Sequence, residues 1–132
     1  MKEPSKEKSY LEKMGRSAGV LMHISSLPGE HGIGDIGESA HAFVDALSDM
    51  DIAVWQFLPL GPTAYGDSPY QPLSAFAGNA NLIGLHQLVE LGLLHEPELE
   101  PLTRLPEDFC DYGRLIPAKR QLLVTAAERL MA

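Results

Sequence analysis

The sequence has 132 residues, of which 45% are apolar and 21% charged, with 12 glycines, 10 prolines, one cysteine and a formal net charge of −8. These proportions exclude a disordered chain, a collagen-like repeat and a disulfide scaffold, and no apolar run reaches the roughly 18 residues of a membrane span. Because no lysine or arginine lies between Ser17 and Thr103, we expect no nucleic acid and no anionic membrane surface as partner, and a neutral ligand is favoured.

Residues 1–16 read as a polar, lysine-rich leader, and residues 17–132 as the body of the protein. The leader lacks the apolar stretch of a signal peptide, and the single Cys110 cannot form an internal disulfide. The sequence therefore predicts a cytoplasmic protein.

The first buried element is predicted over residues 19–24, a continuous apolar run typical of a strand covered on both faces. A glycine-rich loop follows, and the spacing Asp35-x-x-Glu38 predicts a capping box at the start of a helix. One apolar stripe follows at helical spacing, and it should face the core: Ala40, Phe43, Val44 and Leu47.

A second strand is predicted over residues 54–58 and ends at Pro59. Strand, helix and strand in this order form a βαβ unit with parallel strands, so the class is α/β. Ligands of α/β folds bind in the loops after the carboxyl ends of the strands, which here are residues 25–35 and 59–78.

Three further segments complete the chain. A short helix is expected over residues 82–92 with a glycine stop, and an acidic connector interrupted by prolines follows it. Pro117 is expected in the first turn of a last helix, which continues to the C-terminus without a stop signal.

The segment from Tyr65 to Gln71 is the best candidate site. Its tyrosine rings offer flat apolar faces, while Asp67, Ser68 and Gln71 offer hydrogen-bond donors and acceptors. A sugar presents C–H patches and hydroxyls that match such a surface. A tight structural loop with tyrosines packed at its base is the alternative.

Other chemistries have weaker support. Ser68 has no Gly-x-Ser-x-Gly elbow around it, and no two of the five histidines have the spacing of a helical metal site. The spacing Gly32-x-Gly34-x-x-Gly37 matches a dinucleotide fingerprint, but a long loop separates it from the strand and no acidic residue ends the second strand. His23, near the end of the first strand, is either a core residue or a residue that faces the site.

Four segments together resemble the 4-α-glucanotransferases (amylomaltases or disproportionating enzymes, glycoside hydrolase family 77). They occur in the family's order and with its spacing, from about Arg16 onward. The quoted residues are Leu21–Gly29 with Gly32–Gly37, Trp55–Thr63, Tyr65–Gln71 with Ser74–Asn79, and Asp111–Gly113 with Ile116–Pro117 and Lys119–Arg120.

The resemblance implies the first βα units of a (β/α)8 TIM-type barrel, incomplete in this chain. It implies transfer of an α-1,4-glucan segment to the 4-hydroxyl of an acceptor by a retaining double displacement, without metal or organic cofactor. The catalytic carboxylates would come from later strands, so no catalytic residue is expected here. Ser68 and Tyr70 would line the donor subsite, Tyr65 would offer an aromatic face, Asp67 would shape the loop, and His23 is a weaker candidate.

The expected partners are α-1,4-glucans, maltooligosaccharides and a missing C-terminal portion of the same enzyme. We expect the 132-residue chain by itself to be inactive, and either marginally stable or self-associating, because a parallel sheet with open edges is incomplete. The alternative is a catalytically inactive fragment or split-gene product that binds glucan or depends on a partner.

Overall fold

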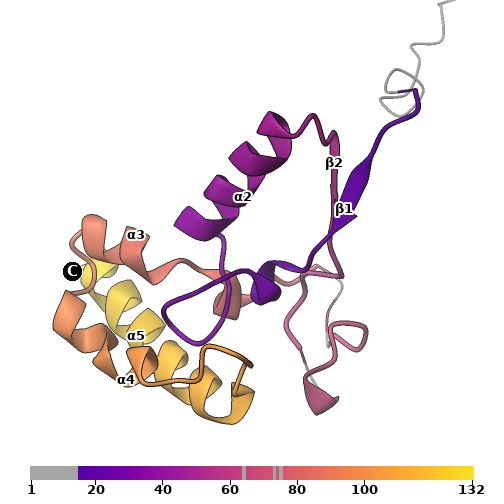
Figure 1. The fold of residues 1–132 in the computed structure, drawn as a ribbon. Coiled ribbons are helices and arrows are strands. Elements are labelled where there is room, and N and C mark those ends of the chain that lie inside the picture. Colours follow the sequence, from indigo (N-terminus) through magenta and orange to yellow (C-terminus); the bar gives the residue numbers. More distant parts are fainter. Residues whose placement is uncertain (1–14, 64, 73, 75) are drawn as a thin grey trace, which may run out of the picture.

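The computed structural model of the chain describes residues 15–132, except residues 64, 73 and 75 and the side chain of Tyr65. The leader predicted over residues 1–16 therefore lies almost wholly outside the described residues. Figure 1 shows a strand–helix–strand unit beside a group of helices from the second half of the chain. The elements are β1 (Gly19–Leu21), η1 (Ile24–Ser26), α2 (Glu38–Asp49), β2 (Val54–Gln56), η2 (Tyr65–Asp67), η3 (Ala80–Leu82), α3 (Leu85–Glu90), η4 (Glu96–Leu99), α4 (Glu100–Thr103) and α5 (Tyr112–Met131).

The predicted parallel pairing and the α/β class are confirmed. β1 pairs with β2 in parallel, with Val20 opposite Trp55, and α2 connects the two strands. The Trp55 indole Nε1–H donates to the Met22 carbonyl at 2.7 Å, and its ring meets Phe43 of α2 edge to face at 5.0 Å. Trp55 therefore joins all three elements of the unit.

Both strands are shorter and more exposed than predicted. Pairing covers three residues in each strand, because the chain turns into η1 at Ile24 and Pro59 has no N–H to donate. The expectation of a strand covered on both faces is wrong for the part of the chain that the structure describes, since Leu21 is 59% exposed. In α2, Ala40 and Leu47 are buried as predicted, whereas Val44 is exposed.

The capping box at Asp35 is also wrong. α2 begins at Glu38 after Gly37, and no side chain caps its first turn. Asp35 instead accepts a hydrogen bond from the Gly37 N–H and lies 3.9 Å from the Lys119 ammonium. The lysine is fully buried and requires a negative partner, which outweighs the local spacing pattern.

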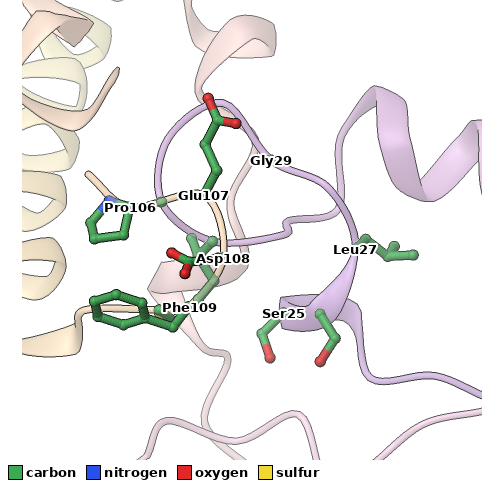
Figure 2. Close-up of a pocket in the computed structure, with 11 residues that line it drawn as sticks. Ser25, Leu27, Gly29, Pro106, Glu107, Asp108 and Phe109 are labelled. Atoms are coloured by element: carbon green, nitrogen blue, oxygen red, sulfur yellow. The ribbon is translucent and has the colours of Figure 1, made fainter. Parts of the chain in front are cut away.

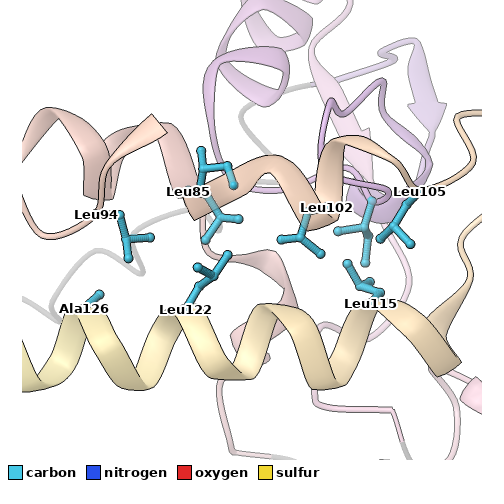
Figure 3. Close-up of a cluster of buried hydrophobic side chains, with 9 residues drawn as sticks. Leu85, Leu94, Leu102, Leu105, Leu115, Leu122 and Ala126 are labelled. Carbon is cyan, nitrogen blue, oxygen red and sulfur yellow. The ribbon is translucent and has the colours of Figure 1, made fainter. Parts of the chain in front are cut away.

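The main hydrophobic core lies between α5 and the segments that precede it (Figure 3). The acidic connector predicted from the proline spacing is in fact helical and supplies Leu99, Leu102 and Leu105 to this core. Two of its prolines, Pro97 and Pro101, occupy the first turns of η4 and α4, where a missing N–H costs no hydrogen bond. The buried cluster consists of Ile33, Leu85, Leu94, Leu99, Leu102, Leu105, Leu115, Leu122 and Ala126.

Of the predictions for the later helices, the glycine stop is confirmed, and the place of Pro117 in the first turn of the last helix is wrong. α3 ends as predicted, since Gly92 adopts φ +71° directly after it. The last helix begins five residues before Pro117, at Tyr112, and Asp111 accepts from the Arg114 N–H at 3.2 Å as its N-cap. None of the helices within residues 15–132 combines the length and apolarity that a bilayer crossing requires.

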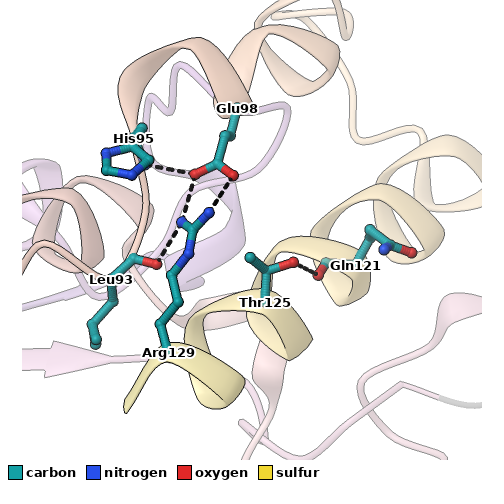
Figure 4. A network of polar contacts seen from close by, with 6 residues as sticks. All are labelled: Leu93, His95, Glu98, Gln121, Thr125 and Arg129. Carbon is teal, nitrogen blue, oxygen red and sulfur yellow. Dashed lines mark hydrogen bonds and ion pairs between the residues drawn. The ribbon is translucent and has the colours of Figure 1, made fainter. Parts of the chain in front are cut away.

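One ion pair holds the end of α5 against η4 (Figure 4). The Arg129 guanidinium donates to both Glu98 oxygens, at 2.7 and 2.8 Å, and to the Leu93 carbonyl at 3.0 Å. The Arg129 hydrogen bonds, together with the His95 N–H, lower the pKa of Glu98 to about 2. The pair is therefore ionised at neutral pH.

His86 of α3 contacts the loop after β1, and we expect Glu30→Gln to lower its pKa. Its Nε2 lies 3.0 Å from a Glu30 oxygen and its Nδ1 lies 3.4 Å from Glu96. The hydrogen bond to Glu30 is the main cause that raises the pKa of His86 above 6.5. The variant should move it back toward 6.5, which an NMR titration of the imidazole protons measures.

The matched control is Glu38→Gln, an exposed carboxylate that makes no contact with His86 among those described. Because the pKa is raised on folding, His86 stabilises the fold below pH 6.5 and loses this contribution as pH rises through its folded pKa. An unchanged titration in Glu30→Gln would contradict the assignment.

Candidate functional site

The loops after β1 and β2 meet around one cavity, as the parallel pairing predicts. Its volume is about 190 Å³. It is lined from both loops, from η3 and from the start of α5 by His23, Ser25, Ser26, Ile33, Leu58, Pro59, Gly61, Thr63, Pro69, Asn79, Leu82 and Tyr112. The expectation that residues 25–35 and 59–78 would come together at the carboxyl ends of the strands is confirmed.

His23 lies where the chain leaves β1 and enters η1. Its backbone is extended, and its carbonyl accepts from the Ser26 N–H at 2.9 Å, which closes the turn. The ring reaches the cavity, and its Nδ1 is buried without a hydrogen-bond partner. Burial lowers the pKa of His23 below 6.5, so the imidazole is neutral at neutral pH.

The candidate segment after β2 forms a tight turn. Gly66 and Asp67 both adopt the left-handed region, with φ +66° and +53°, which reverses the chain just before Ser68. The Ser68 hydroxyl accepts from the Tyr70 N–H, and its carbonyl accepts from the Gln71 N–H, each at 3.3 Å. These bonds fix the backbone of the turn and leave the Ser68 hydroxyl proton available to a ligand.

The predicted site residues take different places around this turn. Tyr70 is 68% exposed, which does not fit the alternative of a tyrosine packed at the base of a structural loop. Pro69 lines the same cavity as His23, so the structure brings His23 and the turn together. Asp67 is exposed, and its charge helps to raise the pKa of Cys110 and of Tyr112. The side chain of Tyr65 lies outside the described residues.

Sequence reasoning missed three residues of the cavity wall. Asn79 donates from Nδ2 to the Gly61 carbonyl at 3.3 Å and accepts at Oδ1 from the Asn81 N–H at 3.0 Å. The Tyr112 hydroxyl is hydrogen-bonded to Ser25 and Cys110, and burial raises the pKa of Tyr112. Thr63 is the third. All three lie in the quoted motifs, but their spacing in the sequence does not show that they meet.

A second cavity of about 260 Å³ lies on the other side of the first loop (Figure 2). The segment from Pro106 to Phe109 faces the loop that carries Ser25, Leu27 and Gly29. Among the described residues, no three His, Cys, Asp or Glu side chains are grouped as metal ligands. The wall of this second cavity therefore offers carboxylate and hydroxyl groups beside the exposed phenyl ring of Phe109.

Comparison with known proteins decides the family. A family model described as 4-alpha-glucanotransferase matches residues 22–132. The chain belongs to the 4-alpha-glucanotransferase family. The match begins directly after β1 and includes both loops, the cavity residues and α5.

Individual members of the family agree with this assignment. The chain is 52% identical over 120 residues to the 4-alpha-glucanotransferase of Streptococcus pneumoniae, covering 86% of this chain and 23% of that protein. It is 56% identical over 103 residues to the enzyme of Clostridium butyricum, covering 77% and 21%. The chain thus spans less than a quarter of the length of these relatives.

A solved glucanotransferase structure shares the fold. The amylomaltase from Streptococcus agalactiae in complex with acarbose superposes with a TM-score of 0.80 at 43% identity, covering 86% of this chain and 23% of that one. At this identity, the arrangement of loops and helices described above is that of a 4-alpha-glucanotransferase.

Proposed function

We propose that this chain is the glucan-binding first part of a 4-α-glucanotransferase, which moves a segment of an α-1,4-glucan to the 4-hydroxyl of an acceptor glucan or glucose. The family match over residues 22–132 carries this proposal. Support comes also from the solved relative, whose ligand is acarbose. A cytoplasmic location stays a prediction from composition.

The strand–helix–strand unit fits the opening of a (β/α)8 barrel. β1 and β2 are parallel and α2 connects them, which is the repeating unit of such a barrel. Leu21 and Phe57 are 59% and 44% exposed, and these apolar surfaces are of the kind that neighbouring strands and helices of a barrel cover. Residues 17–132 would then belong to one catalytic domain.

The turn after β2 has the chemistry of a glucan subsite. The exposed Tyr70 ring offers a flat face to the C–H groups of a glucose unit, and the Ser68 hydroxyl proton is free to donate to a sugar oxygen. Tyr65 would add a second aromatic face, while Asp67 shapes the turn and His23 supports it from the cavity. The absence of Lys and Arg from residues 17–103 suits an uncharged ligand.

The transfer reaction itself requires a pair of carboxyl groups. In a retaining transfer, one carboxylate attacks the anomeric carbon while a carboxylic acid protonates the leaving oxygen, and the two lie about 5–5.5 Å apart. The same acid then activates the acceptor 4-hydroxyl in place of water. Since the resemblance assigns both carboxylates to later barrel strands, we expect this chain to bind glucan without transferring it.

Binding of maltotriose, measured by isothermal titration calorimetry on the full 132-residue chain, tests the proposal. We expect Tyr70→Ala to weaken binding about tenfold, because the variant removes the exposed ring and its contact with the sugar face. In two-dimensional NMR spectra, the sugar should shift the amide signals of residues 66–71.

The control variant is Phe109→Ala, which removes another exposed aromatic ring outside the turn. It should bind maltotriose as the wild type does. A cellotriose titration separates α-1,4 recognition from general stacking. Equal affinity of Tyr70→Ala and wild type for maltotriose, or unchanged amide signals in the turn, would refute the role of the turn in glucan binding. Formation of maltooligosaccharide ladders by this chain would refute the expected absence of transfer.

A further inference from the structure

Two buried polar atoms around one cavity lack a partner. Within the described residues, His23 Nδ1 and Thr63 Oγ1 are the buried side-chain atoms without a hydrogen bond. They come from the loops after two different strands, yet both line the cavity of about 190 Å³. A buried polar group without a partner is unfavourable, so two of them on residues that line one cavity point to a shared partner.

The neighbouring polar groups cannot supply that partner. Asn79 is engaged at both ends of its amide, with the Gly61 carbonyl and the Asn81 N–H. Tyr112 and Ser25 are hydrogen-bonded to each other. In the described arrangement, no polar side chain of the cavity wall, Ser26 included, is a hydrogen-bond partner of His23 Nδ1 or Thr63 Oγ1, and a group that enters the cavity from outside the chain would satisfy both.

The chemistry of the wall specifies a neutral hydroxyl. Of the described residues that line the cavity, none is Asp, Glu, Lys or Arg, so no charge is present to bind an ion. A neutral imidazole nitrogen and a threonine hydroxyl can each donate or accept. An O–H group donates one hydrogen bond and accepts two, so a single hydroxyl satisfies both atoms, and the volume accommodates it.

We propose that this cavity is a hydroxyl-binding site, in which one O–H group of an ordered water or of a glucan hydrogen-bonds to both His23 Nδ1 and Thr63 Oγ1. The group links the end of β1 to the loop that leads into the Ser68–Tyr70 turn. His23 and Thr63 are then positioning residues for that turn. The glucan source rests on the proposed function, whereas the water source is independent of it.

High-resolution crystal structures of the full chain, alone and with maltotriose, test the proposal. We expect an oxygen atom within hydrogen-bond distance of both atoms. Its presence without sugar identifies water, and its appearance only with sugar identifies a glucan hydroxyl. Absence of maltotriose binding would count against the proposed function but leaves the water arm intact.

Three variants and one control distinguish this site from a merely structural role. Thr63→Val removes the hydroxyl at nearly constant shape, and His23→Gln removes the nitrogen at the Nδ1 position, so both should lose the bound oxygen. His23→Asn keeps a polar atom attached at Cγ, as Nδ1 is, and should retain it. Thr103→Val, which makes the same change at an exposed residue outside the cavity, should have no effect.

In solution, the ¹⁵N chemical shift of His23 Nδ1 should change in Thr63→Val and stay the same in Thr103→Val. Three results would overturn the proposal: a cavity without an oxygen in both crystal structures, a direct hydrogen bond between His23 and Thr63, or loss of the oxygen in His23→Asn and His23→Gln alike. If Thr63→Val does not fold, the wild-type crystal structures decide the question by themselves.

Discussion

Replacing Lys119 with methionine is expected to lower the free energy of unfolding by about 3–5 kcal/mol, because it breaks a buried ion pair on one side only. Lys119 is fully buried, donates to the Asn81 carbonyl at 2.7 Å and lies 3.9 Å from an Asp35 oxygen. Without the ammonium group, the Asn81 carbonyl and the Asp35 carboxylate lose the cation that they contact. Urea unfolding followed by circular dichroism measures the change.

The neighbouring cation on the same helix is the matched control. Arg120 is exposed, and Arg120→Met should change the unfolding free energy by no more than about 0.5 kcal/mol. The double variant Lys119→Met with Asp35→Asn should recover part of the loss, since it removes both charges together. A single variant as stable as the wild type would show that the pair contributes nothing.

The pH dependence of stability offers a second test of Lys119. Burial lowers the pKa of Lys119 from 10.5 to about 8, so between these values the unfolded chain binds more protons than the folded chain. This group therefore makes the free energy of unfolding rise with pH in that window. The difference between wild type and Lys119→Met should show this rise, because titrating groups that do not interact with Lys119 cancel in the comparison.

Leu115→Ala is expected to destabilise the chain by about 2–5 kcal/mol, because it opens a cavity in the centre of the main core. Leu115 is fully buried on α5 and packs in the cluster with Leu102 and Leu105, which come from the segment before that helix. The alanine cannot fill the space between α5 and these leucines. Urea unfolding gives the magnitude.

Leu130→Ala on the same helix serves as its control. Leu130 is 72% exposed, so the truncation removes little buried surface and should change stability by less than about 0.5 kcal/mol. Equal effects of the two substitutions would mean that the second half of the chain does not form the described core.

The sequence predictions succeeded where the deciding contacts are local along the chain and failed where the partners are far apart along it. The apolar runs before Pro59 and around residues 19–24 were sufficient to predict two parallel strands with a helix between them. The capping box at Asp35 failed because its true partner, Lys119, lies on the last helix. The segment that the sequence predicted only as an acidic connector contains two short helical elements, in whose first turns Pro97 and Pro101 lie.

For the candidate site, the motifs lie in the loops that line the cavity, but they do not show the contacts between these loops. His23 and the segment from Tyr65 to Gln71 were identified from sequence, and the structure adds that His23 and Pro69 line one cavity. Thr63 gave no signal of its own, because a threonine in a loop acquires a role only when it is buried next to an unpaired group.

By itself, the sequence determined the family, the α/β order of the first half and which loops follow the carboxyl ends of the strands, because these depend on motifs and periods within short segments. Only the tertiary structure decided where the core lies, that Asp35 pairs with the buried Lys119, and that His23 and Thr63 share one cavity. The reason is physical: desolvation requires buried charges and polar atoms to find partners wherever the fold provides them, whatever their separation along the chain.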